Sequence, residues 1–203
     1  MAVNIALKRA RKAAHRKQVV AQKRRVELLE AGLPARVSRA AAAPIQHCFL
    51  TKSVFEEGIG SLILARGFAS LHMGSFLLDT FCLGIKDVVF KQMDAEDFEM
   101  YVDVFDATSA MTSVSPSYAR KLLRELAAWS QTLGFAPHRE FATVERIFGD
   151  VDADASDAAF RFGLDGKPFY IPGPLDTDFI IRQQIERLRK SVGEDGFGFE
   201  TKF

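Results

Sequence analysis

Hydrophobic and polar positions in the first part of the folded region predict extended strands. Residues 45–52, IQHCFLTK, fit a short strand. Residues 61–67 and 71–83 fit two longer strands that are joined by a loop near residues 67–70. The second long strand is apolar on both faces, which is typical of a central strand that is covered on each side.

The pattern changes after Gly84. Ile85, Val88 and Val89 recur at the spacing of one helix face within IKDVVFKQMD, so the sequence predicts a helix over residues 85–94. The next segment, AEDFEMYVDVFDAT, continues as an acidic helix or loop.

The clearest helix signal is in SPSYARKLLRELAAWSQTLG. Ser115 is the expected N-cap, Pro116 the first helical residue and Gly134 the stop signal. A shorter helix is expected within PHREFATVERIFGD, around Phe141, Val144 and Phe148.

The last fifty residues predict a hairpin and a closing helix. AAFRFGLDGKPFYIPG alternates aromatic residues around Asp165 and Gly166, a strong hairpin turn signal. The closing helix is expected between an Asp176 cap and Gly193, and GEDGFGFE follows as an edge strand or an ordered clamp.

These elements, in the order β-β-β-α-α-α-β-β-α, predict an α+β fold with a mainly antiparallel sheet backed by helices. A length of 203 residues with 48% hydrophobic content is enough for one sizeable core. We therefore expect a single domain over residues 45–203. A basic helical arm over residues 1–39, with a linker to about residue 44, is expected to precede it.

Charge separates the arm from the domain. Residues 1–39 hold 11 Lys and Arg against 2 Asp and Glu, a balance of +9, and residues 40–203 hold 16 against 24, a balance of −8. Crowded cations repel one another, and a polyanion relieves the repulsion because neutralised phosphates release counterions. The predicted nucleic-acid-binding residues are Lys8, Arg9, Arg11, Lys12, Arg16, Lys17, Lys23, Arg24 and Arg25.

The leading hypothesis is a non-enzymatic, cytoplasmic protein that associates with RNA or the ribosome through this arm. One alternative is a helix docked on an acidic protein partner, on a neighbouring subunit or on the acidic domain itself. The others are a cleaved transit peptide and a membrane-surface helix. The absence of Ser before Ser38 and the many lysines oppose the transit peptide. No apolar run approaches the length of a transmembrane segment.

The sequence contains no motif that requires a cofactor or a metal. Its two cysteines, Cys48 and Cys82, lie in apolar runs and form no CxxC pair, which favours a reducing compartment and argues against a zinc site.

Asp79 is the most unusual polar position. It alternates with Leu77 and Phe81 on an apolar face, so an ionised carboxylate there needs a partner. The favoured interpretation is structural: an ion pair with Lys86 or Arg66, or a capping acceptor. A second interpretation is a metal-dependent hydrolase or nuclease, whose candidate residues are Asp79, Lys86 and Asp87.

Several segments resemble a family of uncharacterised bacterial proteins. The resemblance rests on FEEGIGSLILAR, GSFLLDTFCLGIKD, LGFAPHREF, DGKPFYIPGP and GFGFE, and it covers about residues 45–200. Some similar chains carry an additional cysteine-rich SEC-C zinc motif, which this chain lacks. The resemblance implies one intact domain and a bacterial origin, and it implies no activity.

Overall fold

The structure is a computed structural model that describes residues 32–200. The chain divides into two units, Met1–Arg36 and Val37–Phe203, and the second unit contains the sheet. Its helical segments are α2 (Leu33–Ala40, which begins in the first unit), α3 (Ala95–Thr108), α4 (Pro116–Thr132), α5 (Phe141–Val144) and α6 (Asp178–Val192), with 3-10 turns η1 (Glu145–Phe148) and η2 (Glu194–Gly196).

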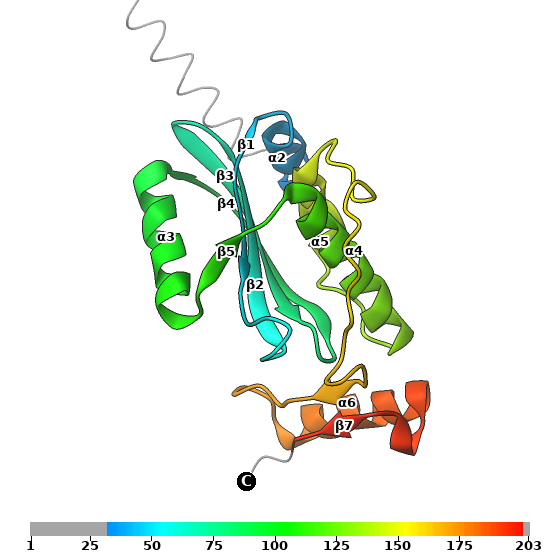
Figure 1. Ribbon diagram of the computed structural model, residues 1–203. Coiled ribbons are helices and arrows are strands. Elements are labelled where there is room, and N and C mark those ends of the chain that lie inside the picture. The colour runs from blue at the N-terminus through cyan, green and yellow to red at the C-terminus, as the bar shows by residue number, and fades with distance from the viewer. Residues whose placement is uncertain (1–31, 201–203) are drawn as a thin grey trace, which may run out of the picture. The chain divides into compact units, whose positions relative to one another are not determined.

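Five strands form one antiparallel sheet in the order β4-β3-β2-β1-β5 (Figure 1). They are β1 (Ile45–Thr51), β2 (Ile59–Gly67), β3 (Ser70–Asp79), β4 (Gly84–Asp94) and β5 (Met111–Ser113). Two short parallel strands, β6 (Phe169–Tyr170) and β7 (Gly198–Phe199), form a separate pair. The predicted α+β class is confirmed.

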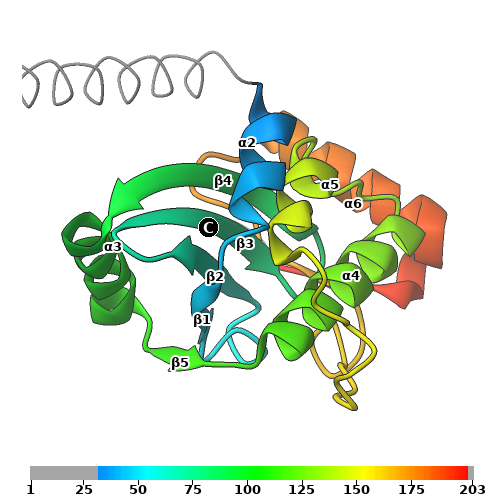
Figure 2. The same ribbon diagram turned by 90° about the horizontal axis from the view of Figure 1, so that it is seen from above.

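Helices cover both faces of the sheet, with α3 on one face and α4 and α5 on the other (Figure 2). On the α3 face, Phe98 packs against Ile63 and Met73. On the opposite face, the ring of Phe76 packs edge-on against Phe141 and tilted against Phe148. Burial on both faces explains why β2 and β3 read as continuous apolar runs rather than as alternating patterns.

The predicted helix over residues 85–94 is wrong, because this segment is the edge strand β4. The register passes from Leu78↔Ile85 to Leu77↔Asp87, so Lys86 is an additional residue, a β-bulge. The bulge shifts the alternation, and Ile85 and Val88 are both buried although they are three residues apart. A bulged strand therefore imitates the spacing of a helix face.

Two predictions in the last fifty residues are also wrong. Asp165 and Gly166 do form a turn with positive φ, but only Leu164 and Lys167 pair across it, so no hairpin strands extend from it. The N-cap of α6 is Thr177, whose hydroxyl accepts the Ile180 N–H. Ser115 caps α4 as expected, with Pro116 as the first helical residue.

Two buried arginines hold the turn that follows η1. Arg66 of β2 donates to the carbonyls of Ala41, Ala43 and Phe148 at 2.5, 2.6 and 2.7 Å. Arg120 of α4 donates to the carbonyls of residues 149 and 151 at 2.9 and 2.5 Å, and to Glu145 at 2.7 Å. Residues 41–43, within the expected linker, are thereby fixed to the sheet.

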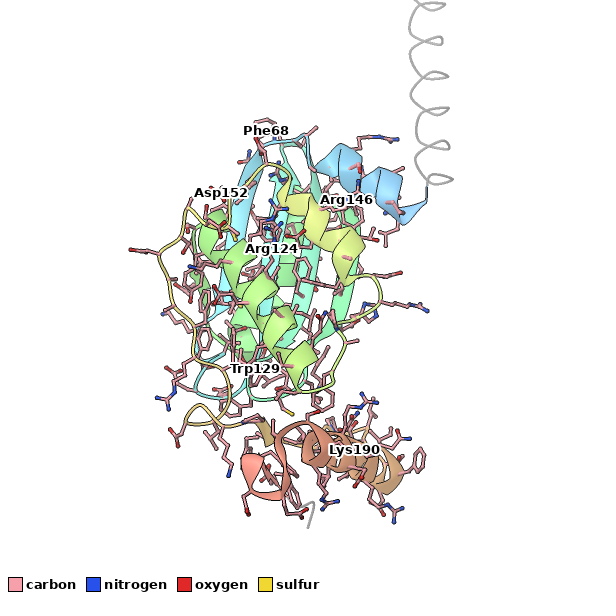
Figure 3. All side chains as sticks on the ribbon, turned by 90° about the vertical axis from the view of Figure 1, so that its right-hand side faces the viewer. Phe68, Arg124, Trp129, Arg146, Asp152 and Lys190 are labelled. Carbon is pink, nitrogen blue, oxygen red and sulfur yellow. The ribbon has the colours of Figure 1, made fainter. Side chains whose placement is uncertain are left out.

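Glu145 supplies the negative charge of this cluster. Burial alone would raise the pKa of its carboxyl, but the hydrogen bonds and charges of Arg120 and Arg124 outweigh burial and lower the pKa below its ordinary value of 4.5. The Arg120 and Glu145 side chains are 11% and 12% exposed. Arg124, labelled in Figure 3, is 52% exposed, so Arg120 is the stronger partner of Glu145.

Glu145→Gln should lower the free energy of unfolding at pH 7 by about 3 kcal/mol, because it leaves the Arg120 charge buried without an anion. In the wild type this contribution is present above pH 4.5 and is lost as the pH falls through the lowered pKa of Glu145. Urea unfolding at pH 7 measures the loss. Glu125→Gln, on the same helix as Arg120 but in a more exposed ion pair with Lys121, should cause no measurable change. Equal losses in the two variants would contradict this account.

The start of β4 depends on close packing against α4. Gly84 has a φ of 75°, and a Cβ there would lie 2.2 Å from Ser130 Oγ, which is fully buried. Gly134 also has positive φ, but a Cβ there would first meet the flexible side chain of Arg187, at 3.1 Å.

Gly84→Ala should therefore destabilise the protein by about 3 kcal/mol, through both backbone strain and overpacking. Gly134→Ala, which adds backbone strain with little collision, should cost about 1 kcal/mol. Adding Ser130→Gly to Gly84→Ala removes the colliding atoms and should recover part of the loss in thermal unfolding. The absence of recovery would show that the contact with Ser130 is not the cause.

Candidate functional site

Asp79 ends β3 and holds the turn that leads into β4. Its Oδ1 accepts the backbone N–H groups of Phe81 and Cys82 at 3.1 and 2.8 Å, and the Leu83 N–H also contributes. The carboxylate is 7% exposed. Arg66, one of the partners expected from the sequence, lies elsewhere in the sheet, since it pairs with His72 in the β2–β3 register.

The burial of Asp79 changes its acidity. Desolvation raises the pKa of its carboxyl above the ordinary value of 3.8, and the nearby charge of Lys86 and the backbone N–H groups oppose this rise without cancelling it. Lys86 is the bulge residue of β4, so the irregularity of the strand brings the ammonium group to the neighbourhood of Asp79.

Asp79 and Lys86 line the same cavity, which has a volume of about 240 Å³. Its other lining residues come from the start of β2 and the loop before it, from the β3–β4 turn, and from the segment around β6. They are Glu57, Gly58, Ile59, Phe81, Phe169, Ile171, Pro172, Gly173 and Pro174. The cavity is therefore mostly apolar, with a few charged groups that can fix the orientation of a ligand.

The segment after β6 is held in place by a buried tyrosine. Tyr170 is fully buried, and its hydroxyl donates to Asp176 Oδ2 at 2.8 Å. The same oxygen accepts the Gly173 N–H at 2.7 Å. Asp176, which the sequence suggested as a helix cap, thus fixes the cavity wall that contains Pro172 and Pro174.

The third candidate residue, Asp87, does not line this cavity. It is exposed, its Oδ1 accepts the Val88 N–H, and it lies 3.8 Å from His138 Nε2. In the part of the chain that the structure describes, no three His, Cys, Asp and Glu side chains gather closely enough to hold a metal ion. The structure thus brings Asp79 and Lys86 together and separates them from Asp87.

The nine basic residues predicted to bind nucleic acid, Lys8 to Arg25, lie outside the described residues. A second cationic surface exists on α6, where Arg182, Arg187 and Lys190 border a groove with the exposed rings of Phe179 and Phe199. Lys190, labelled in Figure 3, also pairs with Glu186 at 3.6 Å, so part of this charge is already compensated.

Sequence reasoning identified Asp79 and Lys86 but not the cavity that they share. Phe169 and Ile171 lie more than eighty residues from Asp79 in the sequence. The only local signal was the run PFYIPGP, whose prolines and glycine limit regular structure. Nothing in this run indicated which part of the sheet it would cover.

No family model matches the chain, and neither the curated proteins nor the solved structures contain a significant match. The resemblance to an uncharacterised bacterial family stays a prediction. Within residues 32–200, no helix has the length and apolar character needed to span a bilayer.

A substitution at Asp79 separates its charge from its role in the turn. Asp79→Asn keeps an oxygen that can accept the Phe81 and Cys82 N–H groups, but it removes the ionisable carboxyl. Because the native pKa is raised, protonation stabilises the folded wild type below pH 3.8, and this stabilisation is lost as the pH rises through the native pKa. Asp79→Asn has a neutral side chain at every pH, so its folded state undergoes no such loss of stability. The stability of Asp79→Asn relative to the wild type should therefore increase with pH.

Chemical unfolding at several pH values between 4 and 8 measures this difference. Asp79→Ala, which loses the acceptor as well, should be less stable than Asp79→Asn by about 1–3 kcal/mol at every pH. A constant difference between wild type and Asp79→Asn across this range would contradict a raised pKa.

Proposed function

We propose that this protein binds RNA, free or within the ribosome, through the basic segment of residues 1–39. The supporting observation is the division of charge: +9 in residues 1–39 and −8 in residues 40–203. An acidic domain repels a polyanion, so we assign RNA binding to the basic segment. The favourable binding free energy comes from the counterions that the neutralised phosphates release. The proposal places the protein in the cytoplasm, where Cys48 and Cys82, both free, stay reduced.

The carboxyl end of the basic segment is firmly attached to the folded domain. Val37 and Ala40 of α2 are fully buried, and Ser38 accepts a hydrogen bond from Arg146 at 2.8 Å. Arg66 binds the two carbonyls that follow at residues 41 and 43. The domain therefore fixes the chain from Val37 onward, which is the part that directly follows most of the basic residues.

The test compares two full-length variants with equal charge loss. The arm variant changes five residues to Gln: Lys8, Arg9, Arg11, Lys12 and Arg16. The control changes five exposed cations of the domain to Gln: Lys52, Arg139, Lys167, Arg182 and Lys190. Fluorescence anisotropy with a single-stranded RNA of about 30 nucleotides gives the dissociation constant at several salt concentrations.

We expect the arm variant to bind more weakly and to lose salt dependence. The slope of log K against log salt should decrease by about 3, because a single strand contributes about 0.7 per phosphate contact. The variant of the five domain cations should keep most of the salt dependence of the wild type. Equal slopes in the two variants, or no salt dependence in the wild type, would overturn the proposal. Retention of a protein partner at high salt and after nuclease treatment would instead support the acidic protein partner.

A further inference from the structure

Two opposite charges share one small apolar cavity at the end of the sheet. Asp79 contributes a carboxylate from the end of β3, and Lys86 contributes an ammonium from the bulge in β4. No ion pair joins them among the contacts of the described residues, and Asp79 is held by backbone N–H groups instead. The charge of Lys86 is close enough to affect the pKa of Asp79, but the two side chains form no direct ion pair.

The turn alone does not require a carboxylate at position 79. An Asn side chain accepts the same N–H groups and forms the same kind of turn, without the desolvation that a buried charge undergoes. A carboxylate that is 7% exposed and lines an open cavity is therefore a group that a cationic ligand can satisfy.

The volume of the cavity limits the size of the ligand. A protein cavity of roughly 150 Å³ holds benzene, so one of about 240 Å³ accepts a molecule of roughly ten non-hydrogen atoms. Phe81, Phe169 and Ile171 provide an apolar wall for a side chain. Two of the lining residues, Ile59 and Ile171, are 41% and 39% exposed, so the cavity is open to solvent.

We propose that this cavity binds a small zwitterion with an apolar side chain, namely a free α-amino acid of about the size of leucine. Its ammonium group lies at Asp79, its carboxylate at Lys86 and its side chain against Phe81, Phe169 and Ile171. A simple amine would satisfy Asp79 but face the Lys86 charge. A simple carboxylate would satisfy Lys86 but face Asp79. Glu57 also lines the cavity, but its side chain is exposed, so solvent screens its charge.

The cavity is largely formed before any ligand binds. Gly58 has a φ of 77°, and a Cβ there would lie 2.3 Å from the Phe81 ring, so this close contact requires glycine. Two backbone hydrogen bonds connect the β3–β4 turn to its neighbours. The Thr80 N–H donates to the Gly58 carbonyl at 2.8 Å, and the Phe169 N–H donates to the Phe81 carbonyl at 2.9 Å. A preformed site spends little binding energy on ordering the protein.

The experiment uses the full chain and three probes of similar shape. They are L-leucine, isopentylamine, which lacks the carboxylate, and isocaproate, which lacks the ammonium. Isothermal titration calorimetry near pH 7.5 gives the three affinities. We expect leucine to bind at least tenfold more tightly than either analogue, because it alone forms both charge-assisted contacts.

Two variants test separately the contact of the ligand ammonium with Asp79 and the contact of the ligand carboxylate with Lys86. Asp79→Asn should reduce leucine affinity to the level of isocaproate and leave isocaproate binding unchanged or stronger. Lys86→Gln should reduce leucine affinity to the level of isopentylamine and leave isopentylamine binding unchanged or stronger. Asp87→Asn, which changes a neighbouring carboxylate outside the cavity, is the matched control and should change none of the affinities.

Circular dichroism confirms that each variant is folded, and Lys86→Gln decides the question if Asp79→Asn does not fold. The proposal is overturned if the wild type shows no saturable leucine binding. It is also overturned if leucine binds no better than its analogues, or if its affinity is unchanged in both cavity variants. None of these outcomes depends on whether residues 1–39 bind RNA.

Discussion

The domain depends on the binding of backbone carbonyls by two buried guanidinium groups. Arg66 and Arg120 come from β2 and α4, and both donate to the residues that end and follow η1. A buried arginine is stable only when most of its N–H groups find acceptors. Here carbonyl oxygens are the acceptors for most of these groups, the Arg66 Nε excepted, and Glu145 is the principal anion. The cluster joins the end of α2, the sheet and the helical layer into one unit.

At the other end of the β2–β3 pair the buried charge is negative. Arg66 lies near the end of β2 that pairs with the start of β3, whereas Asp79 pairs with Ile59 at the opposite end. The carboxylate of Asp79 is bound by backbone N–H groups, but it also lines a cavity that reaches solvent. Both ends of the sheet therefore have a buried charge that the fold uses, but only the charge at Asp79 also lines the cavity.

Much of the fold was predictable because its signals are local. The cap at Ser115 and the strand at residues 45–51 follow from neighbouring residues alone. The expected hairpin around Asp165 failed because β6 pairs with β7, which is distant in sequence. For the site, the sequence identified Asp79 and Lys86, but the walls that make a cavity come from residues whose proximity is set by long-range packing.

The wrong helix prediction and the candidate site have the same physical origin. Inserting Lys86 into β4 brings Ile85 and Val88 to one face, which destroys the period of two that identifies a strand. The same insertion places a lysine beside a buried carboxylate, where a regular strand would have no additional residue. Bulges are common next to functional sites because they redirect one side chain while the sheet stays intact. A sequence that departs from strand periodicity at a charged residue is thus a reason to examine that residue for function, and here the departure leads to the cavity.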